Sequence, residues 1–297
     1  MIPPESENAA EDDSTIATLG YVDPTKMPPK GEKPFIIVFP ISHIPGAKQR
    51  NFGFLQKPGV RIRNLRGREE QFNLDSTGFQ VIRWRFDPSW VISEEAVEQI
   101  YCREAESFLK GVLDAKDVVV FDWLVRKNTP HFEDRRFRKQ LRPALNVHID
   151  QTPRSAVNRV RFHMGSRADE LLRKRFQIIN IWRPLFTPLE DWPLAVCDFR
   201  TTSQSSIVAA DTVGRGEYKG ESAYLKFDPA QEFWYLKHQT VDEVWLMKQF
   251  DSLSDATNHS SERVAQFAAH TAFDDPNAGT NARLRESIEL RMLVFYD

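Results

Sequence analysis

The tetrapeptide VHID, Val147 to Asp150, contains the residues from which a fold can first be inferred. Side chains alternate between the two faces of an extended strand, so His148 and Asp150 are expected to point the same way. An imidazole and a carboxylate side by side can occupy two adjacent positions on a metal ion. The same pattern also fits a salt-bridged pair at an exposed strand end, so His-x-Asp by itself does not establish a metal site.

Two further features lie far downstream. His270 ends the apolar run FAAH, and Arg285-Glu286-Ser287 opens the last strongly apolar segment of the chain. Two histidines and one carboxylate bind one face of Fe(II) and leave three positions for a co-substrate and dioxygen. A guanidinium can grip a carboxylate through two parallel hydrogen bonds, which suits the far end of 2-oxoglutarate. The order His-x-Asp, distant His and Arg-x-Ser therefore indicates a double-stranded β-helix iron oxygenase.

Composition excludes several other classes of function. Lys and Arg total 40 and Asp and Glu total 42, which gives a formal net charge of −2. This near-neutrality argues against a dedicated nucleic-acid binder or a polybasic membrane anchor. No apolar run approaches the ~18 residues of a membrane span, and the acidic start MIPPESENAAEDDS lacks the order of a signal peptide. We expect a cytoplasmic protein that acts on a small molecule, with no nucleic acid or membrane as partner; a homo-oligomer is left open.

The distribution of residue types predicts one domain preceded by an arm. Residues 1–34 are rich in Pro, Asp, Glu and Lys and are expected to form a loose N-terminal arm, and residues 35–297 a single catalytic domain. A helix is expected over 93–113, with Ser93 as its N-cap, and a second helical stretch over 154–174.

The other apolar segments are short and bounded by turn residues, which is typical of strands. They are 34–40, 117–125, 176–182, 193–199, 232–238, 243–250, 263–270 and 287–296. Strands this short and frequent favour a sandwich or barrel over a parallel βαβ sheet. The segment GRGEYKG (214–220) lacks the strand before and the helix after that a phosphate-binding loop requires.

Longer segments carry a family resemblance over nearly the whole chain. In order, they are NLDSTGFQVI (73–82), IYCREAESFLKGVLDAKDVVVFD (100–122), NVHIDQT (146–152), NIWRPL (180–185), DWPLAVCDFRT (191–201), YLKHQTVDEVWLMKQFDS (235–252), AHTAF (269–273) and RESIELR (285–291). With these segments the chain resembles the fungal asaB-type hydroxylase/desaturase family, which includes gibberellin desaturase and the CmcJ-type proteins.

The resemblance implies a non-haem Fe(II)- and 2-oxoglutarate-dependent dioxygenase of secondary metabolism. Its fold would be β-rich (α+β), with a double-stranded β-helix, a jelly-roll or cupin-type core, and flanking helices. Iron ligands would be His148, Asp150 and His270, and Arg285 with Ser287 would hold the distal carboxylate of 2-oxoglutarate. Arg291 shares the strand face of Arg285 and is a rival for that carboxylate or could hold a substrate carboxylate. No catalytic side chain is expected beyond the metal site.

The implied reaction uses dioxygen to oxidise an unactivated C–H bond. Its substrate would be a small carboxylate-bearing or amino-acid-like molecule, and its outcome hydroxylation, desaturation or ring closure. Trp182, Arg183, Tyr235 and His238 are candidates for contact with that substrate. Arg183 could instead form an internal salt bridge, for example with Asp198, because a buried arginine needs a partner.

Two alternatives stay open at this point. One is a cupin-type iron enzyme that does not use 2-oxoglutarate, and the other is a non-catalytic jelly roll that binds a small molecule. The complete set of candidate metal ligands, His148, Asp150 and His270, argues against the non-catalytic jelly roll. The Arg-x-Ser pair disfavours the first alternative, because an enzyme without 2-oxoglutarate has no need of it.

Overall fold

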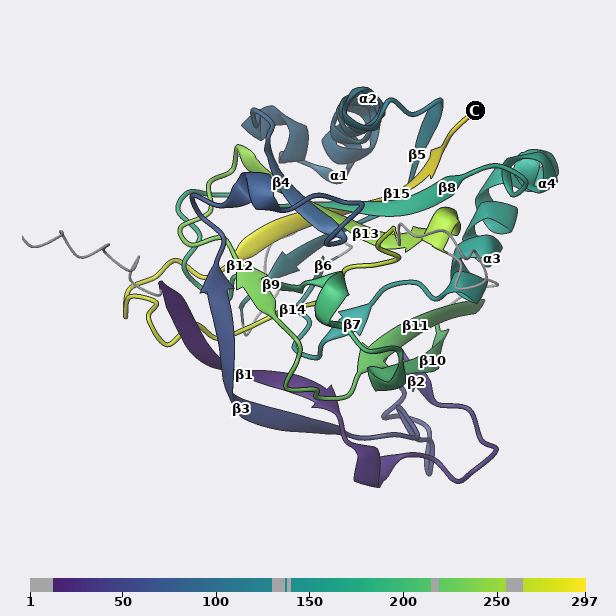
Figure 1. Ribbon diagram of the computed structural model, residues 1–297, viewed down its shortest axis with the longest axis vertical. Helices are drawn as coiled ribbons and strands as arrows, with labels where there is room; N and C mark the ends of the chain where they lie inside the picture. Colours follow the sequence, from purple (N-terminus) through teal and green to yellow (C-terminus); the bar gives the residue numbers. More distant parts are fainter. Residues whose placement is uncertain (1–12, 130–136, 138–139, 215–218, 255–263) are drawn as a thin grey trace, which may run out of the picture.

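Two curled sheets form the body of the protein in the computed structural model, which describes residues 13–129, 137, 140–214, 219–254 and 264–297 (Figure 1). The nine-stranded sheet has the spatial order β1 (Ser14–Val22), β3 (Phe54–Asn64), β12 (Phe233–Tyr235), β9 (Leu194–Cys197), β14 (His270–Ala272), β7 (His148–Ile149), β11 (Lys219–Leu225), β10 (Ile207–Val213) and β2 (Phe35–Ile37). The six-stranded sheet has the order β4 (Phe79–Arg83), β13 (Glu243–Asp251), β8 (Phe176–Pro184), β15 (Glu286–Phe295), β5 (Asp117–Lys127) and β6 (Gln140–Leu141).

A shared apolar core joins the two sheets. Trp182 and Trp245 of the six-stranded sheet lie in one buried cluster with Leu194 and Trp234 of the nine-stranded sheet. Strand pairing is mostly antiparallel, with parallel pairs β12–β3, β10–β2 and β5–β6. Two mixed sheets that face each other across such a core form a jelly roll, the β-rich class that the sequence predicted.

The helical segment 94–113 covers the outer face of the six-stranded sheet (Figure 1). The predicted helix over 93–113 is present as α1 (Glu94–Ala96), a π-helical turn (Val97–Tyr101) and α2 (Cys102–Leu113). The Ser93 hydroxyl accepts a hydrogen bond from the Ala96 N–H at 3.1 Å, which confirms the predicted cap. Ala105 and Leu109 of α2 pack in one cluster with residues of β8 and β15, so helix and sheet share a second core.

The second helical stretch begins directly after the VHID segment. It consists of α3 (Pro153–Met164) and α4 (Ala168–Leu171), and Gly165 between them has a positive φ of 53°. Thr152 caps α3 by accepting a hydrogen bond from the Ser155 N–H. The helix α3 therefore begins three residues after Asp150.

The N-terminal region corrects the sequence-based prediction. Residues 14–22 are no loose arm: β1 pairs with β3 along its whole length, and Leu19 and Tyr21 are fully buried. The first half of the strand alternates, since Ile16 is exposed while Thr15 and Ala17 are buried, and the acidic residues before it concealed this period. Residues 1–12 lie outside the described part of the chain.

Smaller corrections concern strand extent. β2 spans only three residues of the predicted strand 34–40, and the segment before His270 joins the sheet only from that residue onward. β10 and β11 were not predicted, and β11 begins within the GRGEYKG segment.

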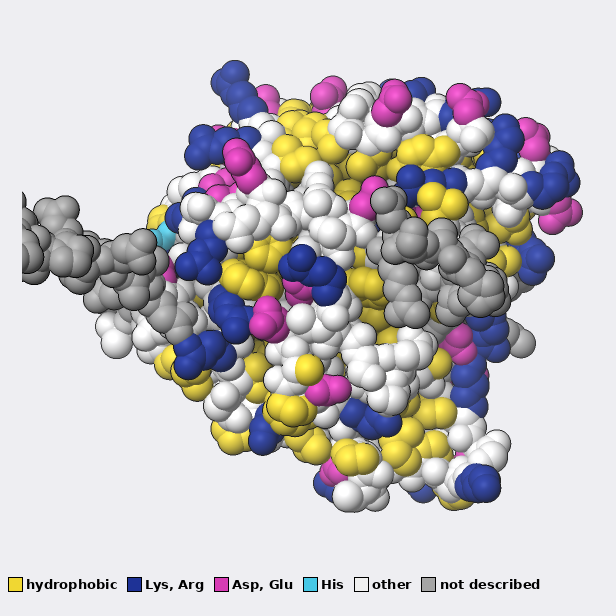
Figure 2. Space-filling model, in the orientation of Figure 1, with side chains coloured by type: hydrophobic (Ala, Val, Ile, Leu, Met, Phe, Trp, Pro, Cys, Tyr) yellow, Lys and Arg dark blue, Asp and Glu magenta, His cyan; other side chains and the backbone are white. Residues whose placement is uncertain are grey.

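Surface properties agree with the balanced composition. On the face shown in Figure 2, basic and acidic side chains are interspersed and form no single basic patch. None of the helices in the described part of the chain has the length and apolar character that crossing a membrane requires.

Candidate metal centre

His148, Asp150 and His270 come together between the two sheets. His148 of β7 and His270 of β14 are direct cross-strand partners, and the centroids of their rings lie 4.4 Å apart. One nitrogen or oxygen atom from each of the three residues lies within 4.8 Å of the others, so the three could hold a metal ion. Ile149 points into the apolar cluster on the opposite face, as the alternation of the strand predicts.

Both imidazoles are held with one nitrogen free. Nδ1 of His148 lies 2.8 Å from the carbonyl oxygen of Asn146, and Nδ1 of His270 lies 3.1 Å from that of Ala268. A carbonyl only accepts, so each Nδ1 carries the proton and each Nε2 keeps a lone pair for a metal. Burial, and then the charge of His148, lowers the pKa of His270 to about 3. His270 is therefore neutral at pH 7, as a metal ligand must be.

Asp150 makes four polar contacts, two through its backbone and two through its side chain. Its N–H donates to Gln249 Oε1 at 2.9 Å, and its carbonyl oxygen accepts from the Ser222 hydroxyl at 3.1 Å. Its Oδ2 accepts from Asn180 Nδ2 at 2.7 Å and lies 3.2 Å from Arg291 Nε. Burial opposes ionisation, but the charge of Arg291 and the interactions with His148 and His270 together outweigh it and hold the pKa of Asp150 well below its usual range.

The segment that leads to His270 is fixed by a close backbone approach. The Ala268 N–H donates to the Lys248 carbonyl at 2.7 Å, and the Lys248 N–H donates to the Gly78 carbonyl at 2.8 Å. Gly78 has a φ of +85°, and a Cβ there would lie 2.3 Å from the Phe267 carbonyl oxygen. Only glycine allows this approach.

Arg285 and Ser287 lie next to the three candidate ligands. The Arg285 side chain is buried, donates from Nε to Ser287 Oγ at 3.1 Å and from Nη1 to the Trp192 carbonyl at 2.7 Å, and lies over the Trp182 ring. It lines a small cavity together with His148, His270 and Trp182. Within the described residues, the Arg285 guanidinium forms no ion pair, so no carboxylate oxygen lies within 4 Å of it; the ion pairs of this region belong to other cations such as Arg291.

Arg291 is in a different situation. Its guanidinium already faces three carboxylates: Asp150 at 3.2 Å, Asp122 at 3.1 Å and Glu289 at 3.3 Å. It lines a larger cavity of about 410 Å³, which His148 and Asp150 also line.

Of the four candidate substrate residues, only Trp182 lies at the site. Arg183, next along β8, points to the other face, where its guanidinium lies 4.2 Å from the Trp84 ring and Nη1 donates to the Val241 carbonyl. Its alternative salt bridge is also wrong, because Asp198 pairs with Arg200. The alternation of β8 is the reason for this correction.

Tyr235 and His238 also lie away from the metal centre. Tyr235 packs edge-on against Phe273 in the core on the far face of the nine-stranded sheet. The His238 side chain is 58% exposed, and its Nε2 lies 3.7 Å from Glu190. Neither residue lines the two cavities beside the candidate ligands.

Three residues of the site were missed from the sequence: Arg126, Asn180 and Glu289. Arg126 lines both cavities, and its Nε lies 4.0 Å from Glu289 Oε2. Asn180 donates to Glu289 Oε1 at 2.6 Å as well as to Asp150. Each is a polar residue inside an apolar strand, which is costly unless partnered, and this signal could have identified them.

Comparisons with known proteins show which family the chain belongs to. A family model described as an oxidoreductase/YMDC permease-like domain matches residues 19–295. The Fe(II)/2-oxoglutarate-dependent dioxygenase nvfI of Aspergillus novofumigatus is 32% identical over 84% of this chain and 87% of its own length. Aspirochlorine biosynthesis protein N of Aspergillus oryzae is 42% identical over 50% of this chain, and the chain covers only 59% of that relative.

A solved structure extends the likeness to the fold. The iron and alpha-ketoglutarate-dependent endoperoxidase NvfI superposes with a TM-score of 0.81 and 29% identity, over 95% of this chain and 98% of its own. Proteins named hydroxylase/desaturase, asaB of Aspergillus flavus among them, are relatives as well. The chain therefore belongs to the family of non-haem Fe(II)/2-oxoglutarate-dependent dioxygenases that includes the fungal hydroxylase/desaturases.

Proposed function

We propose that His148, Asp150 and His270 hold one Fe(II) ion in this enzyme. Two imidazoles and one carboxylate that converge beside a cavity are the donor set that non-haem Fe(II) oxygenases use. The Nδ1–carbonyl hydrogen bonds and the four contacts of Asp150 support the set, because such outer partners orient metal ligands. When bound, Fe(II) with 2-oxoglutarate and dioxygen supplies the oxidant for an unactivated C–H bond.

We further propose that Arg285 and Ser287 bind the distal carboxylate of 2-oxoglutarate. The observation that carries this is the buried Arg285 guanidinium, which has no carboxylate within 4 Å among the described residues and shares a cavity with His148 and His270. Burial, and then the charge of Arg126, lowers the pKa of Arg285 to about 9. An anionic ligand would relieve both costs. Arg291 is less suited to this role, since three carboxylates already face it.

For the substrate, we propose a small organic molecule with an apolar body. The cavity of about 410 Å³ falls within the roughly 300–1,000 Å³ typical of pockets for drug-sized ligands. Its apolar wall is formed by Ile36, Val38, Leu124, Leu141 and Leu145, and His148 and Asp150 lie on the polar side. A carboxylate on the substrate would find Arg126 at the junction of the two cavities. Hydroxylation, desaturation and ring closure are all compatible with this arrangement.

The organisation of the whole chain is also a proposal. We infer one catalytic domain that includes β1 and extends to the C-terminus, since β1 is part of the nine-stranded sheet. A cytoplasmic location and the absence of nucleic-acid and membrane partners are expected from the sequence, which leaves a homo-oligomer open.

The decisive experiment measures the conversion of 2-oxoglutarate to succinate. The full chain is incubated with Fe(II), 2-oxoglutarate and dioxygen, and succinate is measured with and without a panel of apolar acids. We expect succinate that depends on iron and is lost in His148→Ala and His270→Ala. Metal binding without succinate, together with no measurable 2-oxoglutarate binding, would favour an iron enzyme of another kind. If the protein binds no metal at all, the remaining alternative is a non-catalytic jelly roll that binds a small molecule.

A further inference from the structure

We propose that Asn180 and Arg291 are positioning residues that bind Oδ2 of Asp150, so that Oδ1 alone is presented to the metal. This inference rests on the proposed iron site. Asn180 Nδ2 donates to Oδ2 at 2.7 Å, and Arg291, whose Nε–H donates to Glu289 Oε1, forms an ion pair with Oδ2 at an Nε–Oδ2 distance of 3.2 Å. Oδ1 lies 3.5 Å from His148 Nε2, on the side where the two imidazoles meet. The two oxygens of one carboxylate thus have different surroundings.

Strand pairing places both donors at this point. Asn180 of β8 and Arg291 of β15 are direct antiparallel partners in the six-stranded sheet, and Asp150 follows β7 of the opposite sheet. Side chains of such a pair on one face lie close together. One sheet therefore supplies the ligand, and the other supplies a hydrogen-bond donor, Asn180, and a cation, Arg291, for its second oxygen.

The donors are themselves held in place. Glu289 Oε1 lies 2.6 Å from Asn180 Nδ2 and 3.3 Å from Arg291 Nε. Two carboxylates facing one amide fix its NH₂ group toward them, because the amide oxygen would be repelled. At its other end, Arg291 Nη1 donates to Asp122 Oδ2 at 3.1 Å. If either side chain turned away from Asp150, it would also lose its contact with Glu289.

This arrangement has a consequence for coordination. A carboxylate with both oxygens free can bind a metal through two atoms and occupy two positions. With Oδ2 bound to Asn180 and Arg291, the Asp150 carboxylate would occupy one position and leave three for the co-substrates. Loss of such outer partners typically weakens metal binding by 10- to 100-fold.

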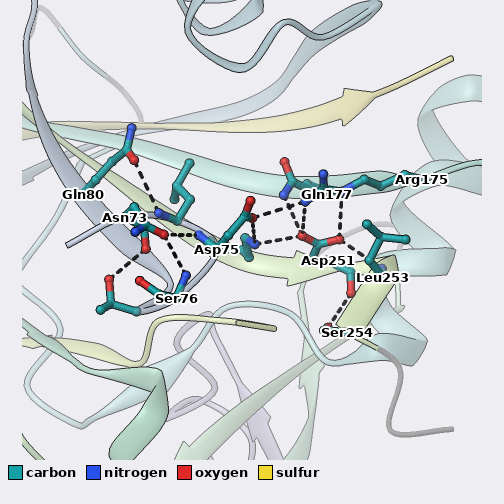
Figure 3. Close-up of polar contacts among 12 residues, drawn as sticks. Asn73, Asp75, Ser76, Gln80, Arg175, Gln177, Asp251, Leu253 and Ser254 are labelled. Carbon is teal, nitrogen blue, oxygen red and sulfur yellow. Dashed lines mark hydrogen bonds and ion pairs between the residues drawn. The ribbon is translucent and has the colours of Figure 1, made fainter. Parts of the chain in front are cut away.

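The chain offers matched controls in a cluster built on Asp251. There, Gln177 Nε2 donates to Asp251 Oδ2 at 2.7 Å and Arg175 Nη2 does so at 2.8 Å (Figure 3). Gln177 lies on β8, as Asn180 does, and none of the cluster's contacts involves the candidate metal ligands. The same two deletions can thus be made on a buried carboxylate with and without a metal role.

The test uses Co²⁺ as the probe and the full chain freed of metal by a chelator. Calorimetry gives the Co²⁺ Kd, the cobalt absorption spectrum reports coordination, and Tm reports folding. We expect Asn180→Ala and Arg291→Gln to weaken Co²⁺ binding about 10- to 100-fold and to alter the spectrum. Gln177→Ala and Arg175→Gln should lower Tm and leave the Co²⁺ Kd and spectrum unchanged.

The possible failures are distinguishable. Wild-type protein that binds no Co²⁺ would overturn the proposed metal site itself. Wild-type binding with an unchanged Kd and spectrum in the Asn180 and Arg291 variants would overturn this inference alone. If Asn180→Ala does not fold, Asn180→Ser replaces it, because the shorter hydroxyl cannot bridge Asp150 and Glu289, and the same two readouts decide.

Discussion

Nε of Arg285 and Oγ of Ser287 lie 3.1 Å apart, two residues apart at the start of the last strand. This hydrogen bond uses the Nε edge of the guanidinium, while Nη1 is bound to the Trp192 carbonyl. The planar group is thereby fixed across the small cavity that His148 and His270 line. A fixed fork binds a carboxylate at lower entropic cost than a free side chain does.

Arg285→Lys is expected to weaken 2-oxoglutarate binding. Lysine keeps the charge but loses the planar fork, and loss of one charge-assisted contact costs about 1.5–3 kcal/mol, or roughly 10- to 100-fold in Kd. Titration of 2-oxoglutarate into metal-loaded protein measures this change in Kd. Arg183→Lys is the matched control, because Arg183 is equally buried but lies on the outer face of β8.

Arg291→Lys tests whether Arg291, rather than Arg285, binds 2-oxoglutarate. If, with the metal saturating, it shifts the 2-oxoglutarate Kd strongly while Arg285→Lys does not, the assignment of the two residues is reversed. If neither variant shifts the Kd, 2-oxoglutarate does not bind in the cavity next to Arg285.

His238→Ala is expected to leave 2-oxoglutarate turnover unchanged. The side chain is 58% exposed, faces Glu190 and does not line either cavity of the site. Stability should change by no more than about 0.5 kcal/mol, as for other surface substitutions. Succinate formation and Tm measure both effects. A large loss of turnover in a folded variant would place His238 in the substrate path after all.

Leu19→Ala tests whether β1 belongs to the folded domain. Leu19 is 1% exposed, so truncation should lower the free energy of unfolding by about 2–5 kcal/mol. Ile16→Ala on the same strand is the control, because Ile16 is 49% exposed and should cost far less. Urea denaturation measures both variants. If both variants lower the free energy of unfolding by the same small amount, residues 14–22 form a loose arm.

Asp251→Asn is expected to reduce stability at neutral pH and to flatten its dependence on acid. Burial raises the pKa of Asp251, but hydrogen bonding to Arg175 and the charge of Lys248 outweigh it, and the net shift is downward. The ionised group thus stabilises the fold above its unfolded pKa of about 3.9, and this contribution is lost as the pH falls.

Breaking a buried pair of this kind costs about 3–5 kcal/mol at pH 7. Urea unfolding at pH 7 and in acid should show the gap between wild type and Asp251→Asn narrowing as the pH falls. A gap that stays constant would mean that another group is responsible for the effect.

Local pattern predicted most elements of the fold and the core of the candidate site. Ser93 capped the expected helix, the apolar runs at 176–182, 243–250 and 287–296 became the central strands β8, β13 and β15, and His148 and Asp150 share a face. These features depend on neighbours in the chain, since caps and alternation act over two to four residues. β1 could have been found in the same way, but the acidic residues before it hid its alternation.

Tertiary structure alone decided the rest. His270 reaches His148 only because β14 and β7 pair, and Arg291 meets Asn180 only through the register of β15 on β8. No spacing in the sequence distinguishes the guanidinium of Arg285, which has no ion pair with a carboxylate among the described residues, from that of Arg291, which three carboxylates surround. Side-chain alternation is a property of each strand, whereas register and sheet order result from burying all the strands together. The sequence therefore determined which residues could form the site, and the packing of the two sheets determined which of them do.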